Sequence, residues 1–353
     1  MKLLDQITYK TKYFKSVEDL IQKIENKTIV PYQVEVQPGR IKGNKICWMP
    51  CTYCYGGSAK NDGTRLDPER YLDIIEQTNN GPNGAIKKVI YAGYATDPLN
   101  YEHIDGLIEK SINSKQVIGI HSKLLKISDS LLKLITSDGL IPTSYLTVSV
   151  DGGDDQSYNL AHNLSLKVKL YNRVIENIKK ITSISKSKKV RLDISTNYLV
   201  TKNNCSKLEV FNGIKNLVEA GVDSIRFSFP QLPRGTDSYT DTIIPNREEV
   251  KKIFSDIKPV IDEFKNSDTD VVLIDYDAEK EIKEPRTLPC FSRFIYPAIS
   301  YDGYLSNCSQ SAATNFRDMA LGNLQTKDFW DAFYDYDKKD IYRYMEKEFK
   351  KMI

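Results

Sequence analysis

The stretch Cys47-Trp48-Met49-Pro50-Cys51-Thr52-Tyr53-Cys54 places three thiols within eight residues, shortly after the β-branched run Val34-Glu35-Val36. Six cysteines in 353 residues are too few for a disulfide scaffold, so clustered thiols indicate a metal site. A structural zinc site would need a fourth ligand, and the nearest histidine in sequence is His103. An iron–sulfur cluster, which thiolates hold, is the other interpretation of this spacing.

Around this stretch, short β-branched runs alternate with longer amphipathic segments from about residue 30 to residue 275. Such a rhythm is typical of βα units around a parallel sheet. It predicts six strands, at 34–36, 88–91, 117–120, 146–150, 191–194 and 224–227. Helices are expected at about 67–79, 99–113, 128–138, 167–182, 206–220 and 246–266. Six units fall short of a closed eight-fold barrel, so we predict an α/β fold with a partial (β/α)6 TIM-type barrel; a doubly wound open sheet is the alternative.

The rhythm changes near both ends of the chain, which predicts four segments. Residues 1–30 form an N-terminal helical extension with a helix near 17–26, and residues 31–280 form the barrel. Residues 281–335, with short strands and turns, form a small α+β domain, and residues 336–353 form a Lys- and Tyr-rich C-terminal helix.

Composition excludes several classes of partner. The 50 Lys and Arg against 47 Asp and Glu leave a net charge of +3, and no basic, aromatic-interleaved patch suggests nucleic acid. No stretch approaches the roughly 18 to 20 apolar residues of a membrane span, and the first residues lack the apolar run of a secretory signal. We therefore expect a cytoplasmic globular protein without a nucleic-acid or membrane partner.

The spacing Cys-x3-Cys-x2-Cys after the first barrel strand resembles the signature of the radical S-adenosylmethionine (SAM) superfamily. The resemblance implies that Cys47, Cys51 and Cys54 hold a [4Fe–4S] cluster whose fourth iron, open to other ligands, chelates SAM. In that family, an electron from the cluster cleaves SAM to a 5′-deoxyadenosyl radical, which abstracts hydrogen from an unactivated carbon. The resemblance also implies an external one-electron reductant such as flavodoxin or ferredoxin.

The same resemblance implies contacts to SAM near the cluster. Tyr53 matches the family's aromatic residue beside the adenine, and a core tyrosine is the alternative. The segment Tyr91–Pro98 occupies the position of a Gly-Gly-Glu-Pro-like segment that binds the amino group of SAM largely through its backbone. Here one glycine is missing and Asp97 replaces Glu. The expected binding residues are Gly93, Tyr94, Ala95, Thr96 and Asp97.

Further candidates stand at strand ends. Ser149 ends the fourth strand and Asn197 follows the fifth, where the family often binds the ribose or the methionyl carboxylate, although polar strand ends also occur without function. Arg226 in the sixth strand and His121 after the third are candidate substrate contacts. The alternative for Arg226 is a buried ion pair, and the alternative for His121 is a core histidine whose hydrogen bonds are satisfied.

A second cysteine pair lies near the C-terminus. Cys290 and Cys308 enclose Gly303 in the pattern Cys-x12-Gly-x4-Cys, and glycine permits a tight hairpin turn. The pattern resembles the opening motif of the SPASM and twitch domains, which hold auxiliary iron–sulfur clusters. No cysteine follows Cys308, which excludes two complete auxiliary clusters. A cluster with an open iron, one completed by a non-cysteine ligand, and a metal-free hairpin all remain open.

Cys205, on the loop after the fifth strand, has three interpretations. It is a passive thiol, a third auxiliary ligand, or a hydrogen-atom donor that quenches a substrate radical.

The leading function is therefore a radical SAM enzyme of the oxidoreductase or isomerase type. The substrate is a ribosomally made peptide (oxidised, crosslinked or epimerised) or a small metabolite such as an aminosugar or a cofactor or antibiotic precursor. An N-terminal extension of 30 residues leaves no room for a leader-peptide recognition domain, which weakens the peptide hypothesis. A non-catalytic iron–sulfur or zinc protein is the alternative from another class.

Overall fold

The computed structural model describes residues 16–42, 46–47, 49–51, 53–54, 63–93, 96–230, 243–274 and 291–337. These residues form two compact units, which we describe separately. Unit 1 comprises the described residues of Met1–Cys47, Ala59–Ile120 and Arg286–Ile353, and unit 2 those of Trp48–Ser58 and His121–Pro285. Tyr94, Ala95, Cys290 and residues 338–353 of the predicted C-terminal helix lie outside the described residues.

Unit 1 contains a mixed sheet with the strand order β10-β9-β8-β1-β2-β3. As predicted, β1 (Gln33–Val36), β2 (Lys88–Tyr91) and β3 (Val117–Ser122) are parallel neighbours. On the other edge of β1, β8 (Ala298–Ile299) also pairs in parallel. The sheet continues antiparallel through β9 (Tyr304–Ser306) and β10 (Gly322–Asn323).

The helices of unit 1 begin at residues that cap them. Ser16 accepts the N–H of Asp19 ahead of α2 (Val17–Glu25), and Asp67 accepts the N–H of Glu69 ahead of α3 (Pro68–Asn79). Helix α4 (Ile104–Asn113) begins later than predicted, because Pro98–Asn100 form a separate 3₁₀ turn, η2. The remaining helical segments of unit 1 are short: α10 (Ser292–Ile295), η3 (Gln310–Ala312), η4 (Thr314–Met319) and α11 (Phe329–Phe333).

Gly303 makes the predicted turn between β8 and β9. Its φ of +88° lies in the left-handed region, and a Cβ there would meet Leu66 Cδ1 at 3.0 Å. Both facts favour glycine. The guanidinium of Arg317 fixes the same turn, because its Nε and Nη2 donate to Asp302 at 2.9 and 2.6 Å.

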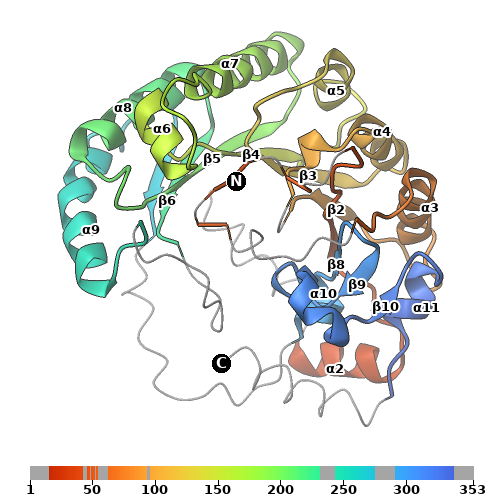
Figure 1. Ribbon diagram of the computed structural model, residues 1–353. Coiled ribbons are helices and arrows are strands. Elements are labelled where there is room, and N and C mark those ends of the chain that lie inside the picture. Colours follow the sequence, from red (N-terminus) through yellow and green to blue (C-terminus); the bar gives the residue numbers. More distant parts are fainter. Residues whose placement is uncertain are drawn as a thin grey trace. The chain divides into compact units, whose positions relative to one another are not determined.

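Unit 2 contains four parallel strands in sequential order: β4 (Tyr145–Ser149), β5 (Asp193–Leu199), β6 (Ser224–Ser228) and β7 (Asp270–Leu273). Its helices are α5 (Asp129–Ile135), α6 (Asp155–Ala161), α7 (Tyr171–Lys188), α8 (Lys207–Ala220) and α9 (Arg247–Asp262). Helices α7, α8 and α9 lie along one side of these strands (Figure 1). Parallel strands joined by crossover helices confirm the predicted α/β fold of the partial TIM type.

Several predicted boundaries in unit 2 were wrong. Strand β5 begins at Asp193 and runs to Leu199, so Asn197 lies inside the strand and not after it. Helix α7 starts and ends later than predicted, because the Ser/Lys-rich stretch after residue 182 continues the helix as far as a left-handed C-cap at Lys189. Helix α6 and strand β7 were not predicted at all.

The two faces of the unit 2 sheet have different roles. The side chain of Tyr198 is fully buried, and a Cβ added to Gly213 of α8 would meet its ring at 3.2 Å, so this face packs against helices. Ser195 and Asn197, which alternate with it, are half-buried on the other face. Polar functional groups are therefore presented on the face that α7, α8 and α9 do not cover.

No helix in the described ranges is long and apolar enough to cross a membrane.

Candidate active site

The predicted cluster loop is divided between the two units. Cys47 belongs to unit 1, and Cys51 and Cys54 belong to unit 2. All three cysteines are half-buried and outside any disulfide, and the N–H of Cys54 donates to the carbonyl of Cys51 at 3.1 Å, closing a turn. Among the described residues, no three His, Cys, Asp or Glu side chains form a group that could hold a metal ion. The assignment of the cluster to these cysteines therefore stays a prediction from their spacing.

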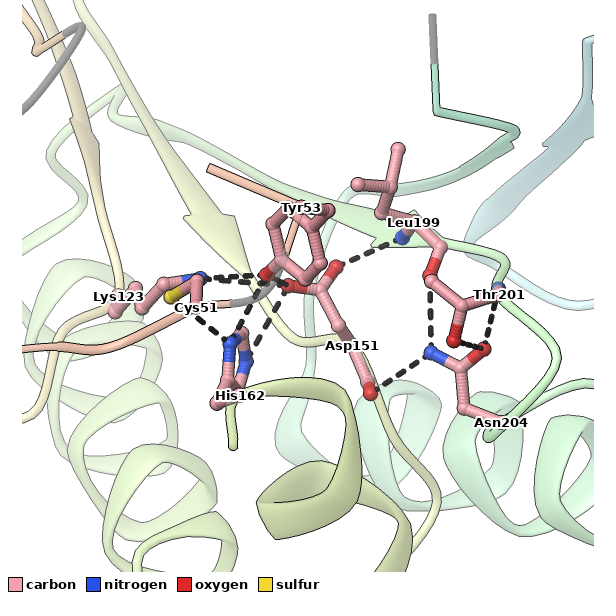
Figure 2. A network of polar contacts seen from close by, with 8 residues as sticks. All are labelled: Cys51, Tyr53, Lys123, Asp151, His162, Leu199, Thr201 and Asn204. Atoms are coloured by element: carbon pink, nitrogen blue, oxygen red, sulfur yellow. Dashed lines mark hydrogen bonds and ion pairs between the residues drawn. The ribbon is translucent and has the colours of Figure 1, made fainter. Parts of the chain in front are cut away.

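Tyr53 joins this loop to the ends of two strands (Figure 2). Its hydroxyl donates to Asp151 Oδ2 at 2.6 Å, just beyond β4, and accepts from Lys123 Nζ at 3.0 Å, just beyond β3. Lys123 Nζ also lies 3.4 Å from Asp151 Oδ2, and the two side chains are only 15% and 2% exposed. A buried ion pair and a tyrosine thus hold the loop in place.

His162, the C-cap of α6, completes the network from below in Figure 2. Its Nδ1 lies 3.0 Å from the Tyr53 hydroxyl and 3.3 Å from Cys51 Sγ. The ring packs edge-on against Tyr158, with the centroids 4.2 Å apart, and is fully buried. One imidazole nitrogen therefore contacts both the tyrosine and a predicted cluster ligand.

The network has a defined charge pattern. Burial, and then the charges of Asp151 and Cys51, raise the pKa of Tyr53 well above its usual value, so the phenol stays protonated. Burial and the positive charge of Lys123 hold the pKa of His162 well below its usual value, so the imidazole is neutral near pH 7. Lys123 and Asp151 are then the charged pair of the network.

Asp151 and Asn204 connect this network to the end of β5. The other carboxylate oxygen of Asp151 accepts the N–H of Leu199 at 2.7 Å. Asn204, fully buried, donates from Nδ2 to the carbonyls of Asp151 at 3.0 Å and Leu199 at 2.9 Å. Its Oδ1 accepts the N–H of Thr201 at 2.6 Å. The ends of β4 and β5 are therefore fixed to each other by side-chain hydrogen bonds.

Two predicted SAM contacts and one predicted substrate contact lie in one row across the unit 2 sheet. Ser149 of β4 is the register partner of Asn197 of β5, which is the partner of Arg226 of β6. All three are half-buried, and the buried Nε of Arg226 has no hydrogen-bond partner among the described residues. An orphaned guanidinium nitrogen beside an amide and a hydroxyl suits a carboxylate ligand. His121, at the end of β3, donates to or accepts from the hydroxyl of Tyr145 at 3.1 Å, so a satisfied core histidine accounts for it.

In unit 1, the segment after β2 makes a close turn. A Cβ at Gly93 would lie 2.0 Å from Thr96 Oγ1 and 2.2 Å from the Thr96 carbonyl, so only glycine fits. Asp97 is buried and its Oδ1 accepts the N–H of Leu99 at 3.1 Å, as an N-cap. The side chain of Asp97 therefore has a structural role, whereas the Gly93–Thr96 turn brings backbone close together.

Residues 41–200 match the model of the Radical SAM superfamily. The chain therefore contains a radical SAM domain, which spans residues 41–200. The matched residues include the three cysteines of the loop and the Tyr53 network, and no curated protein matches the sequence.

Solved structures share the radical SAM fold of this chain. SuiB from Streptococcus suis is 16% identical, with a TM-score of 0.64, and the match covers 90% of this chain and 69% of SuiB. SuiB bound to its precursor peptide SuiA is 17% identical, with a TM-score of 0.65, coverage being 89% and 67%. Native anSMEcpe with bound AdoMet is 16% identical, with a TM-score of 0.59, coverage being 89% and 82%. At these identities the likeness establishes the fold alone.

The residues present fit a radical SAM cofactor set. Cysteines outside any disulfide supply the thiolates that hold iron–sulfur clusters, and the row with the orphaned Arg226 Nε suits the carboxylate of SAM. The close turn at Gly93 suits backbone contact with an amino group.

The remaining predicted thiols lie in different units. Cys205, in unit 2, is half-buried, and burial followed by the charge of Glu209 raises its pKa. Its Sγ donates to the carbonyl of Lys202 at 3.6 Å. Cys308, in unit 1, lies 3.6 Å from Ser311 Oγ. Within the described part of the chain, neither thiol belongs to a group of three side chains that could hold a metal ion, so the auxiliary cluster stays a prediction.

Sequence reasoning missed three residues of the network around Tyr53. Lys123 and Asp151 each follow the end of a parallel strand, which is the position at which functional groups collect and was a usable signal. His162 had no such signal, because it ends a short helix that the sequence did not reveal.

Proposed function

We propose that this chain is a radical SAM enzyme acting on a peptide. Cys47, Cys51 and Cys54 would hold the cluster, which when bound would supply the electron for reductive cleavage of SAM and so the radical chemistry that removes hydrogen from an unactivated carbon. The family match over residues 41–200, which contains all three cysteines, carries this proposal.

The protein's own residues bind and position these groups. Ser149, Asn197 and Arg226 would hold the ribose and the methionyl carboxylate of SAM, since they share one register row on the uncovered face of the sheet. The backbone from Gly93 to Thr96 would hold its amino group. Tyr53 is tied to Asp151 and Lys123, which keeps the cluster loop in one conformation when SAM enters and leaves.

A peptide is supported as the substrate by relatives of the same fold. Solved structures include SuiB bound to its precursor peptide SuiA and anSMEcpe with bound AdoMet and the Kp18Cys peptide. Oxidation, crosslinking and epimerisation all begin with the same hydrogen abstraction, so the first step does not choose among them. An intracellular flavodoxin or ferredoxin would supply the electron, which places the enzyme in the reducing cytoplasm.

The test combines iron binding with SAM cleavage. Anaerobically reconstituted protein should bind about four irons in its SAM cluster and form 5′-deoxyadenosine with dithionite, whereas Cys47→Ala, Cys51→Ala and Cys54→Ala should lose both. Ser187→Ala, on the exposed face of α7, is the matched control for a small side-chain truncation. Wild-type deoxyadenosine yield from any cysteine variant would refute the proposal.

The substrate is tested by co-expression with a short peptide encoded beside this gene. Loss of hydrogen, or an exchange of α-hydrogen for deuterium in heavy water, should appear in the peptide by mass spectrometry and vanish in Cys51→Ala. A peptide left unchanged while the wild-type enzyme acts on a small metabolite would refute peptide modification and leave radical SAM chemistry in place.

A further inference from the structure

His162 is a buried side chain that connects a predicted cluster ligand, Cys51, to the polar network around Tyr53. It is fully buried, it is the C-cap of α6, and its backbone N–H donates to the carbonyl of Tyr158 at 3.1 Å. Its Nδ1 faces Cys51 Sγ at 3.3 Å and the Tyr53 hydroxyl at 3.0 Å, as Figure 2 shows.

A count of hydrogens assigns the tautomer of this ring. Tyr53 has one O–H, and it points to Asp151 Oδ2 at 2.6 Å, where a carboxylate can only accept. The ammonium of Lys123 can only donate to the same phenol oxygen. The contact between Tyr53 and Nδ1 is then a hydrogen bond only if Nδ1 carries the hydrogen.

The other ring nitrogen agrees with this assignment. His162 Nε2 lies 3.4 Å from Asp151 Oδ2 but has no hydrogen-bond partner among the described residues, because the direction of an N–H on Nε2 misses that oxygen. A ring charged on both nitrogens would still donate from Nδ1. The assignment therefore does not depend on the protonation state of His162.

We propose that His162 is a positioning residue that donates its Nδ1–H to the Cys51 sulfur as well as to the Tyr53 oxygen, and so raises the reduction potential of the cluster that Cys51 would hold. This inference rests on the proposed function, because it takes Cys51 as an iron ligand. A metal-bound thiolate only accepts hydrogen bonds, so the donor must be the nitrogen. A hydrogen bond to a ligand sulfur stabilises the more negative, reduced form of a cluster.

The surroundings of the ring hold this geometry. The Tyr158 ring packs edge-on against the imidazole, and the Tyr53 hydroxyl is itself held by Asp151 at 2.6 Å and Lys123 at 3.0 Å. Tyr53 lies between Cys51 and Cys54 in the sequence, and His162 contacts both Tyr53 and Cys51. These two side chains therefore hold the part of the loop that belongs to unit 2. The donor is thus preorganised before any cluster is assembled.

Two amide substitutions of His162 test whether a donor at the position of Nδ1 is needed or whether any polar side chain is enough. The Nδ2 of Asn at position 162 stands near where histidine Nδ1 stands, whereas the Nε2 of Gln stands near histidine Nε2. We expect His162→Asn to keep the midpoint potential of the cluster close to wild type, and His162→Gln and His162→Leu to lower it, as measured by an anaerobic redox titration followed by EPR. His103→Asn and His103→Gln, on the exposed start of α4, are matched controls that should leave the potential unchanged.

Iron content and a second spectroscopic measurement keep the outcomes distinct. If the wild-type protein binds no cluster, the proposed function fails and this inference with it. If the Asn and Gln variants both load iron and have equal potentials, this inference is refuted and the proposed function stands. Long-range ¹H–¹⁵N NMR of histidine-labelled metal-free protein, which has only three histidines, should show a hydrogen on Nδ1 of His162. An Nδ1 without a hydrogen would overturn the proposal even if the Leu variant fails to fold.

Discussion

Replacing Asp151 by Asn should destabilise unit 2 strongly although the two side chains have the same shape. Asp151 is 2% exposed and accepts three hydrogen bonds, from Tyr53, Lys123 and the N–H of Leu199. An amide has only one oxygen, so either orientation puts its NH2 group against a group that can only donate. Lys123, 15% exposed, also loses its counter-ion.

The expected magnitude follows from the burial of the pair. Removing one partner of a buried ion pair costs about 3–5 kcal/mol, because the remaining charge stays desolvated. Removing both charges costs less than removing one, since no charge is left unpaired. We therefore expect the free energy of unfolding to fall by about 3–5 kcal/mol in Asp151→Asn. It should partly recover in Asp151→Asn with Lys123→Met.

The assay is urea unfolding of the reduced, metal-free protein, followed by circular dichroism. Asp129→Asn is the matched control, because it breaks an exposed pair with Lys180, whose side chains are 85% and 47% exposed. That control should change the free energy of unfolding by less than about 1 kcal/mol. If Asp151→Asn behaves like the exposed control, or if the double variant is no more stable than Asp151→Asn alone, the pair is not the support that we describe.

Three further predictions concern other parts of the chain. Gly153→Ala should lower the free energy of unfolding by about 1–3 kcal/mol in the same assay, because its Cβ would lie 2.1 Å from the carbonyl of Glu209; wild-type stability would show that the backbone yields freely. Reconstituted protein should bind more than about four irons if Cys290 and Cys308 are ligands, and their double Ala variant should return to about four; equal counts in both would mean that this pair binds no cluster. Cys205→Ala should lose iron if the thiol is a ligand, or stall the product while iron and deoxyadenosine persist if it is a hydrogen donor, and a variant matching wild type throughout would leave it a passive thiol.

Much of the fold could be predicted from the sequence because most strands are short β-branched runs between amphipathic segments. Strand β5 shows where this reasoning fails. Its second half alternates Ser195 and Asn197 with buried residues, and these polar side chains on the uncovered face look like a loop in the sequence. A strand that presents a binding surface is therefore harder to recognise than one that only packs.

Some residues of the candidate site could likewise be predicted from the sequence, and others could not. Cys47, Cys51 and Cys54 are local in sequence, so their spacing alone indicated the cluster. Lys123, Asp151 and His162 come from different βα units, and only the parallel order of the strands brings the first two to one edge. The place of His162 depends on how α6 ends, and no spacing in the sequence encodes that.

The pairing of β1 with β8 has a consequence for synthesis of the protein. Glu35 is the register partner of Ala298, so one edge of β1 waits for about 260 further residues before its neighbour exists. At a translation rate of about 5–20 residues per second, the interval is about 13–50 s. During that time the nascent chain exposes an unpaired strand edge, which can pair with other chains. On a ribosome stalled between β7 and β8, the strands of unit 2 would already be synthesised. One edge of β1 would still lack its partner β8 and could pair with another chain.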